Sequence, residues 1–148
     1  MSNIEIVKAA VAEYNTKLEE LKASVSKALE PALKDLIKGD IIGVRWTQYT
    51  PYFNDGDPCE FWVNEVYCKT SKNDEDDGDY EDGFISSYSV KYIEGLEVSE
   101  QEKLAKQINE AGELISSIPE SVLQNTFGDG YQITVTADGI DVDDYDHD

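Results

Sequence analysis

Acidic side chains crowd into two short parts of this 148-residue chain. Seven of the nine residues from 74 to 82 carry a carboxylate, and five more candidates lie close to the C-terminus. Carboxylates at this density could accept hydrogen bonds from the Lys and Arg side chains of a partner, or ligate a divalent cation. The candidate binding residues are Asp74, Glu75, Asp76, Asp77, Asp79, Glu81 and Asp82 in the first part, and Asp141, Asp143, Asp144, Asp146 and Asp148 in the second.

The spacing of the second group favours a basic protein partner. If residues 139–144 form a regular strand, Asp141 and Asp143 share one face, about 6.6 Å apart. Phosphates along a nucleic-acid strand have a spacing of the same order, since each advances about 3.4 Å along the axis and also turns around it. The pattern therefore predicts a phosphate-like surface that fits a basic, nucleic-acid-binding groove.

Calcium is the competing ligand for the first group. An EF-hand loop needs oxygen ligands at positions 1, 3 and 5, Gly at position 6 and Glu at position 12. With Gly78 at position 6, the ligand positions hold Asn73, Glu75 and Asp77, but position 12 holds Phe84. The specific motif fails, which leaves weak divalent binding as the alternative to a mobile, solvated loop over residues 71–83.

Residue types for catalysis are sparse. The one histidine, His147, is second from the C-terminus, and the chain contains neither GxxxxGK[ST] nor GxGxxG. Cys59 and Cys68 are nine apart, so on one strand they would point to opposite faces; we expect two unpaired, half-buried thiols. The sequence predicts no enzyme, no catalytic residue, no cofactor and no resident metal.

The net charge of −20 excludes two classes of direct partner, nucleic acid and anionic membrane, because both require a basic surface. All of the excess lies in residues 40–148, since residues 1–39 hold six acidic and six basic groups. No apolar run reaches the roughly 18 residues of a membrane span, and the first residues lack the basic leader of a secretory signal. We expect a cytoplasmic protein.

Residues 3–38 have the spacing of an amphipathic helix. Ser2 and Glu5 form a capping-box pair, Gly39 is a typical stop, and Pro31 predicts a kink or break near Glu30. Two roles are open for the apolar stripe: a coiled-coil seam that forms a homodimer, or packing on the chain's own sheet, which we favour. The stripe consists of Ile4, Val7, Val11, Tyr14, Leu18, Leu21, Val25 and Ala28.

Residues 41–69 change to β-branched and aromatic side chains on either side of FNDGDP, which predicts two antiparallel strands around a turn. Their aromatic residues favour a core with an exposed edge for a protein partner. The candidates for that contact are Trp46, Tyr49 and Tyr52.

The remaining elements complete an α+β pattern within one domain, 1–148. Residues 84–92 alternate like a strand, and Ser99 with Glu102 has the spacing of a second capping box that opens a helix. Pro119 begins a short helix that ends at Gly128, and two strands around Asp138-Gly139 lead into an acidic tail, 144–148. We expect a long N-terminal helix and a second helical segment packed on an antiparallel sheet of about five strands.

Two stretches, WTQYTPYFNDGDPCEF (46–61) and GIDVDDYDHD (139–148), resemble segments of a set of small uncharacterised proteins of bacteria and their phages. The resemblance implies a prokaryotic or phage setting and no particular activity. In size and acidity the chain is also similar to phage-encoded DNA-mimic inhibitors, a likeness of class only. The first hypothesis is therefore a non-enzymatic inhibitor of a basic, nucleic-acid-handling host protein, such as a defence nuclease or a transcription or repair factor. The alternative is an oligomerising structural or adaptor domain that recognises a protein through aromatic residues and is acidic mainly for solubility.

Overall fold

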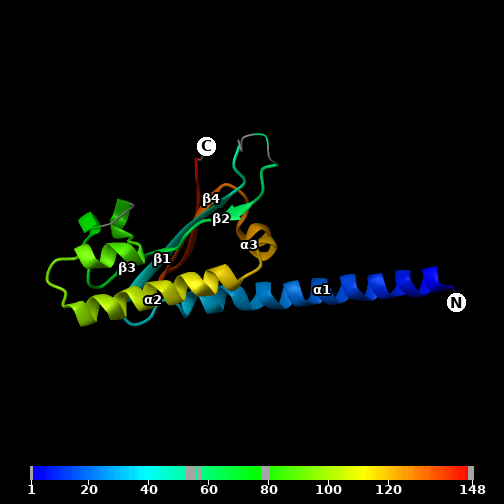
Figure 1. The fold of residues 1–148 in the computed structure, drawn as a ribbon, viewed down its shortest axis with the longest axis horizontal. Coiled ribbons are helices and arrows are strands. Elements are labelled where there is room, and N and C mark those ends of the chain that lie inside the picture. Colours follow the sequence, from blue (N-terminus) through cyan, green and yellow to red (C-terminus); the bar gives the residue numbers. More distant parts are fainter. Residues whose placement is uncertain (1, 53–55, 57, 78–80, 147–148) are drawn as a thin grey trace.

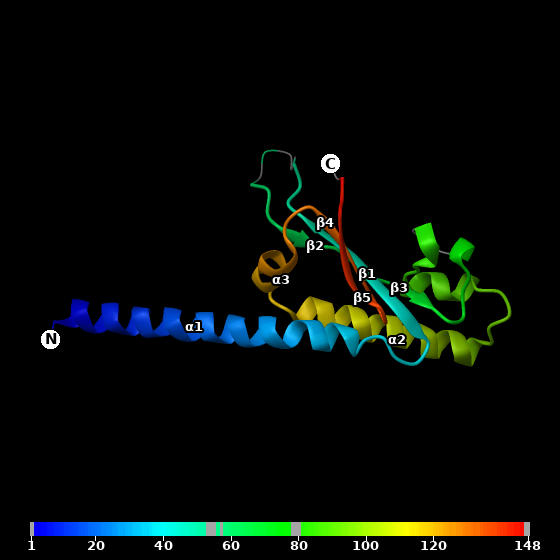
Figure 2. The ribbon, with the colours of Figure 1, turned by 180° about the vertical axis from the view of Figure 1, so that it is seen from behind.

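The computed structural model describes residues 2–52, 56, 58–77 and 81–146. A long helix projects from a body made of a sheet, two further helices and short 3₁₀ turns (Figures 1 and 2). The expected α+β fold is confirmed. No helix among the described residues is long and apolar enough to cross a membrane. In chain order the elements are α1 (Asn3–Lys34), β1 (Ile41–Tyr49), β2 (Trp62–Val63), β3 (Tyr67–Thr70), η1 (Glu75–Asp77), η2 (Glu81–Gly83), η3 (Ser87–Tyr92), α2 (Val98–Ser117), α3 (Glu120–Phe127), β4 (Tyr131–Thr136) and β5 (Gly139–Asp144).

The sheet is antiparallel and is organised around β1. On one side β1 pairs with β4, which pairs with β5 at the edge; on the other side it pairs with β2 and β3 in turn. Successive side chains along a strand point to opposite faces of the sheet, and residues paired across neighbouring strands point to the same face. Trp46, Ile133 and Val142 share the inner face, where the helices cover Trp46 and Ile133 and leave Val142 exposed at the edge. Arg45, Thr134 and Asp141 share the outer face.

A buried amide holds the inner face to α3. Gln48 is fully buried, and its Nε2 donates to the carbonyl oxygens of Leu123 (2.9 Å) and Gly128 (2.8 Å). Its Oε1 accepts from Trp46 Nε1 at 3.0 Å. These bonds use both ends of the amide, so the end of α3 is fixed over the sheet beside the Trp46 ring. The three α-helices, the sheet and the segment before η3 all contribute side chains to the rest of the core. These side chains include Leu29, Leu33, Val44, Ile85, Leu104, Ile108, Ile115, Val122, Ile133 and Val135.

The N-terminal helix begins as predicted, but it continues without interruption past Glu30, where a kink or break was predicted. Ser2 and Glu5 form the capping box, with Ser2 Oγ accepting from the Glu5 backbone N–H at 3.2 Å. The helix continues unbroken through Pro31, so the predicted break is wrong. Pro31 lies in the last turn, where its missing N–H costs a single hydrogen bond, and the burial of Leu29 and Leu33 holds the turns on either side of it.

Packing of the apolar stripe on the chain's own sheet is the second wrong expectation. Within α1 the buried residues are Leu29 and Leu33, and the stripe from Ile4 to Leu21 lies beyond the body (Figure 1). A helix of 32 residues is about 48 Å long. The longest strand, β1, has nine residues and spans about 30 Å. The sheet is therefore too short to cover the whole stripe.

Two local predictions are also corrected. Residues 84–92 are not a strand: Ile85 makes one bridge to Cys68, and η3 follows, with Val90 and Ile93 turned into the core. The helix α2 begins at Val98 with Glu97 at the N-cap, and no side chain caps it, so the Ser99–Glu102 capping box does not form. At this start Gln101 supplies the contacts instead, because its backbone N–H donates to the Glu97 carbonyl at 2.9 Å and its Nε2 donates to the Leu96 carbonyl at 3.2 Å.

Replacing Gln48 tests how far the fold depends on the buried amide. Gln48→Ala removes three buried hydrogen bonds and leaves the indole N–H of Trp46 without its partner, so we expect a loss of about 2–3 kcal/mol in the free energy of unfolding. Urea unfolding measures the loss. Gln132→Ala on the outer face is the control and should change stability by less than about 0.5 kcal/mol. Equal effects would show that the Gln48 bonds contribute little.

Candidate acidic binding face

The edge strand β5 presents the C-terminal carboxylates. Asp141 lies opposite Thr134 and Asp143 lies opposite Gln132, so the two aspartates share the outer face, as predicted. Asp144 follows on the other face and Asp146 lies just past the strand; all four side chains are exposed. We call these four residues the β5 cluster. Asp148 lies outside the described residues.

The segment from residue 71 to residue 77 and η2 fold back on each other. Asn73 Oδ1 accepts from the Thr70 backbone N–H at 3.1 Å, and Asn73 Nδ2 donates to the Gly83 carbonyl at 2.8 Å. Gly83 has φ +81°, and a Cβ there would lie 2.8 Å from Asp74 O. Glycine is thus required where the two turns meet. Mobility of this segment stays a prediction; Asp79 lies outside the described residues, as do the side chains of Asp77 and Glu81.

Two carboxylates of this segment pair with the protein's own cations. Asp82 Oδ2 lies 3.6 Å from Arg45 Nη2, and Glu75 Oε1 lies 3.6 Å from Lys69 Nζ. Arg45 is held from its other side as well, because its Nε donates to Thr134 Oγ1 at 3.0 Å and its guanidinium lies over the Phe84 ring. Both acids are exposed, so each pair contributes little to stability.

The two acidic parts of the sequence meet the same side of the sheet. Asp82 contacts Arg45 on β1, Arg45 contacts Thr134 on β4, and Thr134 lies opposite Asp141 on β5. Strands are about 4.8 Å apart, so Asp141 is about 10 Å from the Arg45 position. Figure 2 shows β5 and, near β3, the green segment that contains η1 and η2. The outer face therefore carries acids from both groups.

The aromatic candidates divide into three environments. Trp46 is a correction: it is 1% exposed and packs edge-on against Phe127 in the core, so it cannot contact a partner. Tyr49 is half-buried and stacks on Tyr145 with ring centroids 5.6 Å apart. Tyr52 is 78% exposed. Trp62 is 59% exposed and was missed as a candidate, because its place on the two-residue edge strand β2 is not visible in composition.

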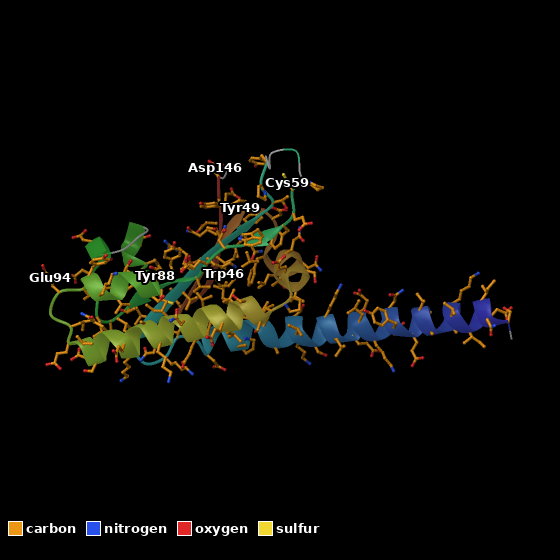
Figure 3. All side chains as sticks on the ribbon, in the orientation of Figure 1. Trp46, Tyr49, Cys59, Tyr88, Glu94 and Asp146 are labelled. Carbon is orange, nitrogen blue, oxygen red and sulfur yellow. The ribbon has the colours of Figure 1, made fainter. Side chains whose placement is uncertain are left out.

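A surface groove of about 660 Å³ lies between Tyr52 and the end of β5. Asp129 closes one side of it by accepting from the backbone N–H and the hydroxyl of Thr50, at 2.8 and 2.6 Å. Figure 3 shows Tyr49, Cys59 and Asp146 at this end of the sheet. Sequence reasoning missed Asp129, although its position between two glycines is typical of a turn. The groove is lined by Thr50, Pro51, Tyr52, Cys59, Asp129, Gly130, Tyr131, Asp144, Tyr145 and Asp146.

The two cysteines differ in burial: Cys59 is half-buried and Cys68 is buried. Both cysteines are free, which confirms that they do not pair with each other. Burial raises the pKa of the Cys68 thiol to about 12, so it stays protonated and unreactive at neutral pH. Within the described ranges, no three His, Cys, Asp or Glu side chains are grouped to hold a metal ion. His147 lies outside those ranges.

Comparison with known proteins gives no relative: no family model matches the chain, and no curated protein or solved structure matches it significantly.

The two thiols should react at very different rates. At pH 8 in the native protein, Cys59 should react with a thiol reagent such as DTNB, whereas Cys68, buried and with a pKa of about 12, should not. The expected result is one thiol titrated per native chain and two in denaturant. Cys59→Ser is the control and should leave no rapid reaction. Two fast equivalents in the native state would contradict the burial of Cys68.

Proposed function

We propose that the chain is an acidic, non-enzymatic protein of the bacterial cytoplasm, phage-encoded, that binds a basic nucleic-acid-handling protein and inhibits it by occupying its nucleic-acid groove. The proposed contact surface is the β5 edge of the sheet, with Asp141 and Asp143 on the outer face and Asp144 and Asp146 beside them. The class of target is a defence nuclease or a transcription or repair factor.

The observation that carries this proposal is the uncompensated charge of the β5 cluster. The described strands carry two basic residues, Arg45 and Lys69, and each lies beside a carboxylate of the 71–83 segment. β4 and β5 contain no Lys or Arg. The carboxylates of β5 are therefore left to face solvent, and two of them, Asp141 and Asp143, are ordered on one face at a phosphate-like spacing of about 6.6 Å.

Such a surface acts through many weak contacts. A single exposed ion pair contributes at most about 1 kcal/mol, so an array is needed for useful affinity. Ion pairs made in this way are screened by salt, and a basic protein cannot hold nucleic acid in the same groove at the same time. Binding by mimicry must therefore be weakened both by salt and by competing DNA.

Neutralising the β5 cluster tests the proposal. We expect Asp141→Asn, Asp143→Asn, Asp144→Asn and Asp146→Asn together to weaken capture of a basic partner from bacterial lysate and to lower the salt concentration at which it elutes. The measurement is a pull-down eluted in steps from about 0.1 to 1 M salt, with each partner identified by mass spectrometry and challenged with DNA.

A matched control separates the cluster from net charge. The variant Glu100→Gln, Glu102→Gln, Glu110→Gln and Glu113→Gln removes the same number of charges from α2 and should leave capture unchanged. Equal weakening by both variants would show that capture depends on net charge and not on the β5 cluster. Partners that resist both salt and DNA would overturn mimicry.

The exposed ring of Tyr52 supports a second candidate function, an oligomerising adaptor that recognises a partner through aromatic contact. Tyr52 lines the groove beside Tyr145, where one ring could stack between the chain and its partner. Such binding would depend on apolar burial and would resist salt.

Replacing Tyr52 distinguishes the two candidates. If the adaptor function holds, Tyr52→Ala abolishes capture at about 0.5 M salt, a concentration that screens ion pairs. Tyr88→Ala, equally exposed but on η3, is the matched control and should bind normally. A thermal melt verifies that both variants fold. Normal capture by Tyr52→Ala would exclude this ring as the contact.

A further inference from the structure

The projecting part of α1 has an apolar face that the described residues do not cover. Between Asn3 and Leu21 every side chain except Leu18 is exposed, and Leu18 is only partly covered. Soluble proteins rarely leave a continuous apolar stripe of this length in water, and such a stripe usually marks an interface. The exposed fractions along it are Ile4 68%, Val7 60%, Val11 51%, Tyr14 65%, Leu21 64% and Val25 37%.

The spacing of the stripe is that of a coiled coil. Its residues alternate at intervals of three and four, which fills the a and d positions of a heptad for more than three heptads. The a positions are Ile4, Val11, Leu18 and Val25, and the d positions are Val7, Tyr14, Leu21 and Ala28.

The exposed stripe of α1 requires a partner that buries it along its whole length. A helix gains most of its stability in water from packing of its apolar face. Among the described residues, those of α1 that are buried against the body are Leu29 and Leu33, near its C-terminal end. A second helix with the same heptad pattern and the same length covers the stripe completely. The chain itself supplies that helix.

We propose that α1 pairs with α1 of a second copy of this chain in an antiparallel coiled coil. We place the two-fold axis between the two helices at the level of Thr16 along the helix axis. Each a position then meets a d position of the other copy. The layers are then Ile4 with Ala28, Val7 with Val25, Val11 with Leu21, and Tyr14 with Leu18, each occurring twice. This interface does not depend on the proposed function of the sheet.

Layer volumes favour the antiparallel orientation. In a parallel pair, residues of the same number meet, which gives a Tyr14–Tyr14 layer and an Ala28–Ala28 layer. The first is overpacked and the second leaves a void, and both are unfavourable. The antiparallel pairing places the bulky Tyr14 against Leu18 and the small Ala28 against Ile4, so the layers are more nearly equal.

The charge distribution favours the same orientation. Residues 1–39 carry no net charge, so the whole net charge of −20 belongs to residues 40–148 and lies at one end of α1. A parallel pair would place two such bodies side by side. In the antiparallel pair, the two Leu29 residues are about 39 Å apart along the helix axis, at 1.5 Å per residue. That is several times the Debye length of about 8 Å at physiological salt, so repulsion between the bodies is screened.

The lysines beside the seam fit this arrangement without deciding it. The e and g positions carry Lys8, Lys17 and Lys22 and no acid. Lys17 and Lys22 are each neutralised within their own helix, at 3.1 Å from Glu13 and 3.8 Å from Glu19. Lys8 of each copy approaches the acidic body of the other copy in the antiparallel pair, and would be remote from both bodies in a parallel pair.

The first test is the mass in solution. By light scattering at about 50 µM, we expect twice the 16.6 kDa of one chain. Val11→Glu places a charge in a dry layer opposite Leu21 and should weaken the dimer at least about tenfold. Ile6→Glu is the matched control, because Ile6 is an exposed apolar residue of the same helix outside the stripe, and it should leave the dimer intact. A monomeric wild-type chain, or equal effects of the two variants, would overturn the proposal.

The second test determines orientation. In the antiparallel pair, the double variant Val11→Glu with Leu21→Lys puts the new carboxylate of each copy beside the new ammonium group of the other copy. This variant should recover at least about tenfold in affinity over either single variant. In a parallel pair the same variant opposes carboxylate with carboxylate and ammonium with ammonium, and would bind more weakly than either single variant. The second outcome would overturn the antiparallel arrangement, and loss of dimer in all three variants would do the same.

Discussion

Alternation of side chains along β1 is the constraint on which the body depends. Val44, Trp46 and Gln48 point inward and receive α1, α2 and α3, whereas Arg45 and Thr47 point outward. Each strand that pairs with β1 inherits the same two faces through its register. A slip of one residue would bury Arg45 and expose Trp46, so the hydrophobic inner face fixes the position of every carboxylate on the outer one.

The sequence predicted the elements whose signals are local. The capping box at Ser2, the Asp138-Gly139 turn and the strands β1, β4 and β5 depend on neighbours in the chain, and all of these are present. The strand expected over residues 59–69 is instead divided into the short strands β2 and β3. Errors arose where distant residues decide. Residues 84–92 alternate like a strand, yet Ile85, Val90 and Ile93 are drawn into a core made by α2, which favours a 3₁₀ turn. Pro31 is tolerated because burial on both sides of it outweighs the lost hydrogen bond.

The candidate site shows the same division. That Asp141 and Asp143 share a face follows from strand periodicity alone, and the structure has them so. That Asp82 and Glu75 lie beside Arg45 and Lys69 could not be predicted, because it depends on how the 71–83 segment folds back over β1 and β3. Trp46 was misassigned because aromatic composition does not distinguish the inner face from the edge.

The acidity of β5 also limits how the chain can self-associate. An edge strand has unpaired backbone N–H and C=O groups on its outer side, and another sheet can add to it, which leads to open-ended aggregation. Neighbouring copies that approached along β5 would bring rows of aspartates together, so sheet extension is opposed at the edge where it would start. The proposed association through α1 avoids this repulsion, because residues 1–39 carry no net charge. A pair formed in the proposed way would have no second seam from which to grow, and it would leave the outer face of each sheet uncovered.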